Sequence, residues 1–200
     1  IISIRKKIVI IPHRNPDGDA LGSALALKHF LDAKKHKVNI VSPNDYPTFL
    51  KWLPGESEII KFSKRPNTAR DKINNAELIF GLDFNSLSRI QDLSEIVRRT
   101  KVDKIMIDHH ESPEFFANLN YSDPNMSSTC EMVYNVINAS DSKLLNKKIA
   151  CCLYTGIMTD TGSFRYPSTT AKTHKVVSHL LSLGANSSEI HQKIFDSSSM

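Results

Sequence analysis

Three short apolar runs that end in acidic or histidine side chains constrain the fold of this chain more than any other feature. They cover residues 7–13, 77–83 and 103–109. Continuous runs of Ile, Leu and Val without polar alternation are typical of strands that are covered on both faces, as in parallel sheets. A helical pattern from about Asp19 to Leu31 and a strand-like run over 38–42 complete a β-α-β unit. The sequence therefore predicts an α/β fold in which a parallel sheet has helices on both faces.

The ends of these runs indicate where a ligand would bind. His13, Asp83 and Asp108 end the three runs, and parallel strands bring such residues together at the carboxyl edge, where open α/β sheets bind ligands. Further helices are expected over 88–99, 128–137, 147–158, 171–183 and 187–195. Ser128 and Glu131 have the spacing of a capping box. The helix over 147–158 would bring Asp160 to its C-terminal end.

Composition narrows the protein class. The 200 residues, 40% of them hydrophobic, suit one domain with a sizeable core, or one domain and the start of another. Apolar runs are far shorter than the ~20 residues of a membrane span, so we expect a soluble, cytoplasmic protein with no membrane partner. The three cysteines lack C-x-x-C spacing and indicate neither a disulfide framework nor a zinc knuckle. The net charge of +5 permits an anionic substrate, but scattered Lys and Arg are weak evidence for nucleic-acid binding.

Six carboxylate or imidazole side chains are candidate metal ligands: His13, Asp17, Asp19, Asp83, His109 and Asp160. Each alone has a simpler interpretation as a turn, helix-cap or strand-end residue. Together they exceed what one tetrahedral site needs, and mixed oxygen and imidazole ligands suit Mn²⁺ or Mg²⁺ better than structural zinc. Two ions ~3.5–4 Å apart would share a bridging carboxylate and a bridging hydroxide, which suits in-line attack on phosphorus. His110, Arg89 and the helix start at 128–129 are candidates for phosphate binding.

The segments around these residues resemble the four motifs of the DHH phosphoesterase superfamily. The first motif matches residues 13–23, His-Arg-Asn-Pro-Asp-Gly-Asp-Ala-Leu-Gly-Ser, and the second centres on Asp83. The third is the triplet Asp108-His109-His110, which gives the family its name, and the fourth centres on Asp160 within residues 156–162. The resemblance covers essentially the whole chain and implies a phosphoesterase core with two Mn²⁺ ions.

By motif position, the resemblance implies a role for each candidate. One metal would be held by His13 and Asp17, the other by Asp19, His109 and Asp160, and Asp83 would bridge both. Asp108 would orient His109 from behind. His110 would face the substrate phosphate or the leaving oxygen, and Arg89 would contact phosphate. The segment Ser127-Ser128-Thr129 resembles a loop of the nano-RNase and pAp-phosphatase branch, and we expect it to bind substrate.

The resemblance also implies a domain organisation. Members of this superfamily usually carry a second, C-terminal domain, called DHHA1, whose Gly-Gly-Gly-His motif helps to grip the substrate, and no such motif occurs in this chain. We expect residues 1–185 to form the DHH metal-binding catalytic domain. Residues 186–200 would start a linker helix toward an absent DHHA1 domain, so that the chain is a truncated form of a two-domain enzyme.

The leading functional prediction is a Mn²⁺-dependent phosphoesterase that hydrolyses short oligoribonucleotides (nano-RNA), 3′-phosphoadenosine 5′-phosphate, or both. Inorganic pyrophosphatases, cyclic-dinucleotide phosphodiesterases and recombination-repair exonucleases of the same superfamily share the metals, and the first two stay open as alternatives. A metal-binding or nucleotide-binding module without turnover is the alternative from another class. A homodimer is also left open.

Overall fold

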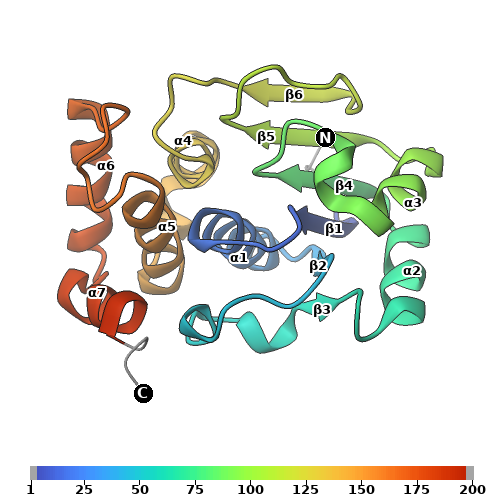
Figure 1. Cartoon of the computed structure of the whole chain (residues 1–200), viewed down its shortest axis with the longest axis horizontal. Coiled ribbons are helices and arrows are strands. Elements are labelled where there is room, and N and C mark those ends of the chain that lie inside the picture. The colour runs from blue at the N-terminus through green and yellow to red at the C-terminus, as the bar shows by residue number, and fades with distance from the viewer. Residues whose placement is uncertain (1–3, 197–200) are drawn as a thin grey trace.

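The computed structural model describes residues 4–196, and its centre is one parallel sheet of six strands (Figure 1). The strands are β1 (Lys7–Pro12), β2 (Lys37–Ser42), β3 (Ile60–Lys61), β4 (Leu78–Leu82), β5 (Lys104–Asp108) and β6 (Leu119–Ser122). Their order is β3-β2-β1-β4-β5-β6, and every neighbouring pair is parallel. The order changes direction between β1 and β4, which is the point where doubly wound sheets bind ligands.

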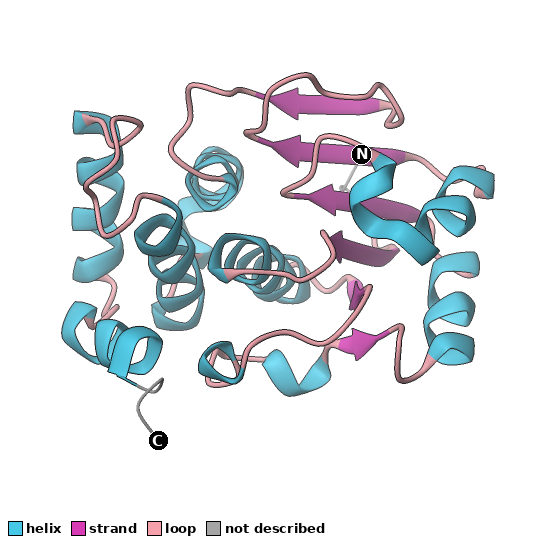
Figure 2. Cartoon of the chain, viewed as in Figure 1, coloured by secondary structure: helices cyan, strands magenta, loops and turns pink. Residues whose placement is uncertain are grey.

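Helices cover both faces of the sheet, as the sequence predicts (Figure 2). Within the described residues they are α1 (Gly18–Ala33), α2 (Pro66–Asn74), α3 (Ser94–Arg99), α4 (Thr129–Asp141), α5 (Lys147–Asp160), α6 (Ala171–Ser182) and α7 (Ser187–Phe195). Four short 3-10 helices join them: η1 (Thr48–Leu50), η2 (Glu56–Glu58), η3 (Leu87–Leu93) and η4 (Ser142–Leu144). α1 and α4 lie on one face and α2 and α3 on the other. α5 packs on α1 and α4, and α6 and α7 pack outside α5.

Strand β1 shows why the continuous apolar runs become central strands. Ile8 and Ile10 point into the hydrophobic core under α1 and α4, whereas Val9 and Ile11 point into the second core under α2 and α3. All four side chains are at most 1% exposed. Each fully buried side chain of this size contributes about 1.5–3 kcal/mol to folding. An apolar residue therefore stabilises the fold at every position of the strand, whichever face it points to.

A glycine contact brings α1 and α5 unusually close to each other. A Cβ atom on Gly22 of α1 would lie 2.5 Å from the backbone oxygen of Cys152 in α5. A Cβ atom on Gly156 of α5 would in turn lie 2.9 Å from the carboxylate of Asp19. Only glycine permits this approach. The contact therefore sets the distance between the start of α1, with Asp19, and the end of α5, with Asp160.

The prediction of one continuous helix over 88–99 is wrong in one respect. The chain forms η3 and then α3, and Gln91 between them has φ 42° and ψ −110°, which no helix contains. The apolar side chains still face the core, because Ile90, Leu93 and Val97 are all buried. Apolar spacing thus gives the buried face correctly but does not reveal a local break in the backbone.

The apolar pattern does not predict three other elements, α2, β3 and β6. β3 has two residues, and β6 is an edge strand with Leu119 and Asn120 exposed. Neither strand has the continuous apolar run that marks the central strands. Pro66 stands at the first turn of α2, where its missing N–H costs nothing.

Helix α7 belongs to the same hydrophobic core as the preceding residues. Its Ile190 and Ile194 are buried in the core cluster of α1 and α5, and the helix packs on η1 and α5. Packing therefore continues across residue 185, and the domain boundary expected there stays a prediction. Residues 197–200 of the expected linker lie outside the described residues. No helix of the described residues has the length and apolar character that crossing a membrane requires.

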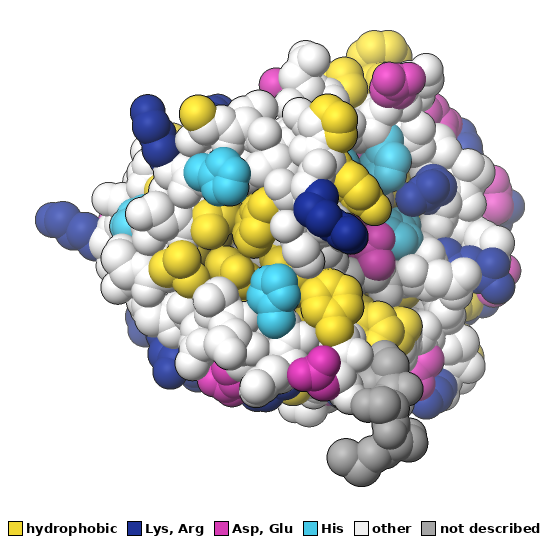
Figure 3. All heavy atoms as spheres, turned by 60° about the vertical axis from the view of Figure 1, so that its left-hand side comes forward, with side chains coloured by type: hydrophobic (Ala, Val, Ile, Leu, Met, Phe, Trp, Pro, Cys, Tyr) yellow, Lys and Arg dark blue, Asp and Glu magenta, His cyan; other side chains and the backbone are white. Residues whose placement is uncertain are grey.

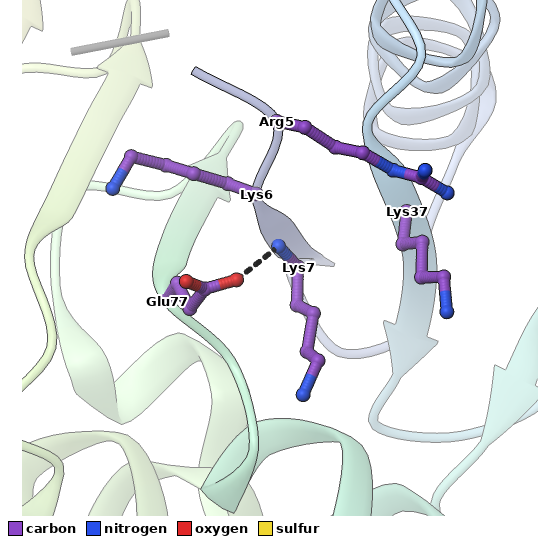
Figure 4. Close-up of a pocket in the computed structure, with 5 residues that line it drawn as sticks. All are labelled: Arg5, Lys6, Lys7, Lys37 and Glu77. Atoms are coloured by element: carbon purple, nitrogen blue, oxygen red, sulfur yellow. Dashed lines mark hydrogen bonds between the residues drawn. The ribbon is translucent and has the colours of Figure 1, made fainter.

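The amino edge of the sheet is basic. Arg5, Lys6, Lys7 and Lys37 line a shallow cavity of about 260 Å³ there, together with Glu77 (Figure 4). The backbone N–H of Lys7 donates to Glu77 Oε2 at 2.8 Å, which ties the start of β1 to the residue before β4. This cluster lies at the opposite end of the strands from the predicted ligand edge.

Candidate metal centre

The ends of three adjacent strands place chemically active side chains together, as the sequence predicts. His13 follows β1, Asp83 follows β4, and Asp108 is the last residue of β5, with His109 and His110 after it. These strands are neighbours in the sheet. Asp83 has a positive φ of 64°, a left-handed conformation that Asp tolerates better than most residues. This backbone turn directs its carboxylate across the strand ends.

Two helix ends bring further carboxylates to the same point. Asp17 is the N-cap of α1, and its side chain accepts hydrogen bonds from the backbone N–H groups of Asp19 and Ala20, each at 3.0 Å. Asp160 is the last residue of α5. The structure is compatible with both interpretations of Asp17, as a helix cap and as a candidate metal ligand, because it caps α1 and also borders the cluster.

Asp19 is held in a different way from Asp17. Its side chain is 1% exposed and accepts hydrogen bonds from the N–H groups of Thr129 at 2.7 Å and Cys130 at 2.8 Å. These two donors belong to the first turn of α4. Asp19 therefore satisfies the N-terminus of a helix that begins 110 residues later. Nothing in the local sequence around Asp19 signals this contact.

The first ligand group consists of His13, Asp17 and Asp83. His13 Nε2 lies 3.9 Å from Asp17 Oδ1 and 3.5 Å from Asp83 Oδ2. Ligand atoms of these three residues all lie within 4.8 Å of one another. We call this set the His13 group.

The second ligand group consists of Asp19, His109 and Asp160. His109 Nε2 lies 3.9 Å from Asp19 Oδ2 and 3.4 Å from Asp160 Oδ2. The same nitrogen lies 3.7 Å from Asp83 Oδ1, so Asp83 turns one oxygen toward each group. We call this set the His109 group. Asp83, His109 and His110 form a further cluster within the same limit of 4.8 Å.

Backbone carbonyl groups orient both candidate histidine ligands. Nδ1 of His13 lies 2.7 Å from the backbone oxygen of Arg14, and Nδ1 of His109 lies 3.3 Å from that of Met126. A proton on Nδ1 satisfies each carbonyl oxygen and leaves Nε2 with a lone pair directed at carboxylates. A lone pair that faces carboxylate oxygens is stabilised by a proton or a metal cation between them.

The distances fit such a cation. Oxygen and nitrogen ligands lie about 2.1 Å from Mg²⁺ or a similar ion, so two ligands at octahedral or tetrahedral angles lie about 3.0–3.4 Å apart. The separations of 3.4–3.9 Å between Nε2 and carboxylate oxygens in the two groups come close to this range. They are longer than most direct hydrogen bonds. The residues present therefore fit divalent metal ions with mixed oxygen and imidazole ligands.

The electrostatics of the site also favour added positive charge. Burial, together with the charges of Asp83 and Asp160, raises the pKa of Asp19 well above its usual range. Burial raises the pKa of Asp160 to about 6. Burial alone would lower the pKa of His13, but its contacts with the carboxylates of Asp17 and Asp83 raise this pKa to about 10. Crowded carboxylates that draw in protons are also suited to binding a divalent cation, whose charge offsets theirs.

Asp108 holds His110, and the expectation that it orients His109 is wrong. Asp108 is fully buried, and its carboxylate lies 2.7 Å from Nδ1 of His110 and accepts the backbone N–H of His110 at 3.2 Å. His109 has the backbone oxygen of Met126 in this role. The hydrogen bond to Asp108 raises the pKa of His110. The reason for the difference is geometric: residue 110 turns back over the strand end, while His109 points to the carboxylates.

Ser127, Ser128 and Thr129 are hydrogen-bonded inside the protein, and the contact with substrate that the sequence predicts for them stays a prediction. All three are at most 2% exposed. Ser127 donates to the buried carboxylate of Glu131, and Ser128 accepts the backbone N–H of Glu131. Thr129 Oγ1 donates to Asp83 Oδ1 at 3.0 Å. The segment therefore positions candidate ligands, a role that the sequence does not reveal.

Glu131 also departs from the predicted capping box. Ser128 forms its half of the box, but the Glu131 carboxylate accepts the hydroxyls of Ser127 and Thr173 instead of the N-cap N–H. Thr173 lies in the first turn of α6, so this buried carboxylate links α4 to α6. The expected capping box is therefore only half present.

Arg89 lies at the exposed rim of the site. Its backbone oxygen accepts the N–H of Arg14 at 2.8 Å, which joins the loops after β1 and β4. Its guanidinium is near enough to His110 to oppose the rise in the pKa of that imidazole. The predicted contact of Arg89 with phosphate stays a prediction.

Comparison with known proteins agrees with this architecture. A family model described as the DHH family, N-terminal domain, matches residues 7–157. The matched range contains every candidate ligand except Asp160, which follows its end by three residues.

Similar proteins cover nearly the whole chain. The bifunctional oligoribonuclease and PAP phosphatase NrnA of Thermus thermophilus is 31% identical over 192 residues, which covers 96% of this chain and 55% of that protein. The cyclic-di-AMP phosphodiesterase PdeA of Listeria monocytogenes is 27% identical over 96% of this chain and 30% of that protein. A solved structure of an exopolyphosphatase-related protein from Bacteroides fragilis has 43% identity and a TM-score of 0.94 over 96% of this chain and 57% of its own. This chain thus spans about half the length of NrnA.

Proposed function

Because the chain belongs to the DHH family, we propose that it supplies the metal-binding centre of a phosphoesterase that hydrolyses short oligoribonucleotides, 3′-phosphoadenosine 5′-phosphate, or both. The similarity to NrnA over 96% of this chain supports this choice of substrate. The match covers 55% of NrnA, so activity on these substrates is a proposal for this chain.

One observation carries the proposal more than any other, namely the position of Asp83. Its Oδ2 lies 3.5 Å from His13 Nε2, and its Oδ1 lies 3.7 Å from His109 Nε2. A carboxylate with one oxygen toward each of two ligand groups is what a shared ligand of two ions requires. Thr129 donates to Oδ1 and keeps the carboxylate in this orientation.

We propose the following ligand sets for this centre. The first ion is held by His13, Asp17 and Asp83, and the second by Asp19, Asp83, His109 and Asp160. Mn²⁺ is the proposed metal and Mg²⁺ its alternative, because both accept carboxylate and imidazole ligands. Two ions bound in this way would polarise a phosphate ester and activate water for in-line attack.

The chain's own residues supply the remaining roles. Asp108 fixes the His110 ring through Nδ1, which leaves Nε2 as the atom that faces outward. We assign to this Nε2 the contact with the substrate phosphate or the leaving oxygen. Arg89, exposed at the rim, is the proposed second contact to phosphate, because a guanidinium binds phosphate oxygens in pairs.

Two other activities and a module without turnover compete with this proposal. The similarity to PdeA supports cyclic-dinucleotide hydrolysis, though with lower identity. Pyrophosphate hydrolysis would use the same ions and needs no nucleoside contact. A binding module without turnover would keep the ligands but release no product.

The test is an assay of the protein with Mn²⁺ on diribonucleotide, 3′-phosphoadenosine 5′-phosphate, cyclic-di-AMP and pyrophosphate. We expect turnover of the first two, its loss with a chelator, and its recovery when Mn²⁺ is added back. His110→Gln should lower turnover while metal affinity, measured by calorimetry, stays unchanged. Asp103→Asn, at an exposed position before β5, is the control and should match the wild type. If the protein hydrolyses none of the four substrates, the enzyme proposal is wrong.

A homodimer and a cytoplasmic location stay predictions. Light scattering of the purified protein would give the oligomeric state directly.

A further inference from the structure

A cavity of about 460 Å³ opens beside the candidate metal centre. Its walls come from the start of α1, from η1, from the end of α5, from α7 and from the loop between α5 and α6. Asp17 lies in this wall and also belongs to the His13 group. A molecule that fills the cavity would therefore reach a candidate metal ligand at one end.

The side of the molecule that carries α6 and α7 has a mixed surface (Figure 3). Hydrophobic side chains gather on it next to basic, acidic and histidine side chains. Among the cavity residues, Tyr166 and Phe195 are 54% and 53% exposed, and Phe49 is half-buried. Exposed aromatic rings around a concave site are suited to stacking against a flat ring system.

The position of Tyr166 is set by Gly162. Gly162 has a φ of 56°, and a Cβ atom there would lie 2.6 Å from Cζ of the Tyr166 ring. The tyrosine ring therefore lies directly on the glycine backbone, where no other residue would leave room for it. The aromatic wall is positioned by the chain itself although more than half of Tyr166 is open to solvent.

Arg165 adds a positive charge to the same wall. Its Nε donates to the backbone oxygen of Gly162 at 2.7 Å, which fixes the base of the guanidinium group. The terminal nitrogens of a guanidinium held in this way are suited to binding a phosphate oxygen pair. A nucleotide offers a flat base, a phosphate and a reacting phosphate ester. The cavity offers aromatic rings for the first, a fixed guanidinium for the second and the adjoining candidate metal centre for the third.

We propose that this cavity is a nucleoside pocket, in which Tyr166 stacks on the base and Arg165 binds a phosphate of a nucleotide whose other end lies at the metal centre. Its volume lies within the roughly 300–1,000 Å³ of small-molecule sites. A second cavity of about 300 Å³, under β6, is lined by apolar residues and Tyr121 and offers no cation to a phosphate. The inference rests on the proposed function in that it names the part of the substrate bound next to the reacting phosphate.

The first experiment compares the binding of AMP and ribose 5-phosphate, by calorimetry with Mg²⁺ present. The two ligands share sugar and phosphate, so their difference in affinity measures the contribution of the base. We expect AMP to bind about tenfold or more tightly than ribose 5-phosphate, the range of one stacked base. Equal affinities of the two ligands for the wild type would overturn the proposal.

Variants assign that difference to the pocket. Tyr166→Ala should weaken AMP binding about tenfold and leave ribose 5-phosphate unchanged, whereas Tyr166→Phe, which keeps the ring, should retain AMP affinity. Arg165→Gln should weaken both ligands. Lys37→Gln, in the basic cluster at the opposite edge of the sheet, controls for general charge and should have no effect (Figure 4). An unchanged AMP affinity in Tyr166→Ala, with its fold confirmed by circular dichroism, would contradict the proposal.

The outcomes separate this inference from the proposed function. If the protein hydrolyses diribonucleotide and Tyr166→Ala leaves its KM unchanged, the enzyme proposal holds and the pocket is wrong. If no substrate is turned over but AMP binding depends on Tyr166, the pocket stands and the enzyme proposal fails.

Discussion

Asp17 and Asp19 stand two residues apart, yet they cap different helices and belong to different ligand groups. Asp17 caps its own helix, and its side chain is 59% exposed. Asp19 binds the first turn of α4, and its side chain is 1% exposed. The His13 group is therefore partly built by one short loop, while the His109 group depends on contacts between distant parts of the chain.

One short motif can therefore hold a residue that stabilises its own helix and another that stabilises a helix far away in the sequence. Replacing Asp17 disturbs a local helix cap that water and neighbouring side chains can partly replace. Replacing Asp19 leaves buried N–H groups of α4 without an acceptor, and water does not reach them. The proposed metal binding and the stability of the fold should thus be separable at Asp17 and joined at Asp19.

The largest expected effect removes the residue that both groups share. Asp83→Asn removes the one negative charge that the two proposed sites share, so metal affinity at each should fall about 100-fold. Calorimetric titration with Mn²⁺ measures the affinities, with Asp103→Asn as the control. Retention of one tight site would show that Asp83 serves a single ion, and would contradict the proposal that both ions share it.

The next expected effect compares the two aspartates directly in metal-free protein. Asp19→Ala should lower the free energy of unfolding by about 2 kcal/mol, because two buried N–H groups lose their acceptor while some carboxylate repulsion is relieved. Asp17→Ala should lower it by about 1 kcal/mol, as for an ordinary N-cap. Urea unfolding with a chelator present measures both values. A larger loss for Asp17→Ala would reverse the comparison.

A milder substitution separates the cap from the ligand at Asp17. The Asn side chain still accepts the backbone N–H groups, so Asp17→Asn should change the free energy of unfolding by less than about 0.5 kcal/mol. Metal affinity of the His13 group should nevertheless fall about tenfold, since a charge is lost. Urea unfolding and calorimetry on the same preparation test both statements. Loss of stability without loss of metal affinity would mean that Asp17 is only a cap.

The smallest expected effect concerns a carboxylate outside the site. The hydrogen bond from Lys64, together with that from Lys61, holds the pKa of Asp45 well below its usual range, whereas burial raises the pKa of Asp19 and Asp160. A depressed pKa stabilises the fold above about pH 4 and loses this contribution as the pH falls further.

Asp45 is partly exposed, so its contribution should stay below about 1 kcal/mol. The difference in unfolding free energy between wild type and Asp45→Asn should therefore shrink as the pH falls from about 7 to about 3. Urea unfolding across this range measures it. A difference that does not change with pH would show that the ion pairs with Lys61 and Lys64 do not stabilise the fold.

The sequence predicts the features that depend on local pattern. Continuous apolar runs give β1, β4 and β5, and the ends of these strands give the positions of His13, Asp83 and His109. These predictions succeed because a central strand needs apolar residues on both faces, and because parallel strands end at a common edge.

The remaining features depend on contacts between distant residues. The bond from Thr129 N–H to Asp19 spans 110 positions, and the bond from Thr129 Oγ1 to Asp83 spans 46. Asp19 and Asp83 can each be interpreted locally as a helix-cap or strand-end residue. Their neighbours in the sequence therefore do not reveal the bonds to Thr129. The hydrogen bonds between Asp108 and His110 depend on the turn of the backbone after β5, which the residue types alone do not predict.

Glu131 decides how short a working fragment of this protein can be. The family match ends at residue 157, but the carboxylate of Glu131 has its second hydroxyl donor at Thr173. A fragment that stopped before α6 would leave the buried Glu131 carboxylate with Ser127 as its remaining hydroxyl donor, next to the residues that position Asp19 and Asp83. The smallest autonomous unit of the candidate metal centre should therefore extend past the end of the family match and include the start of α6.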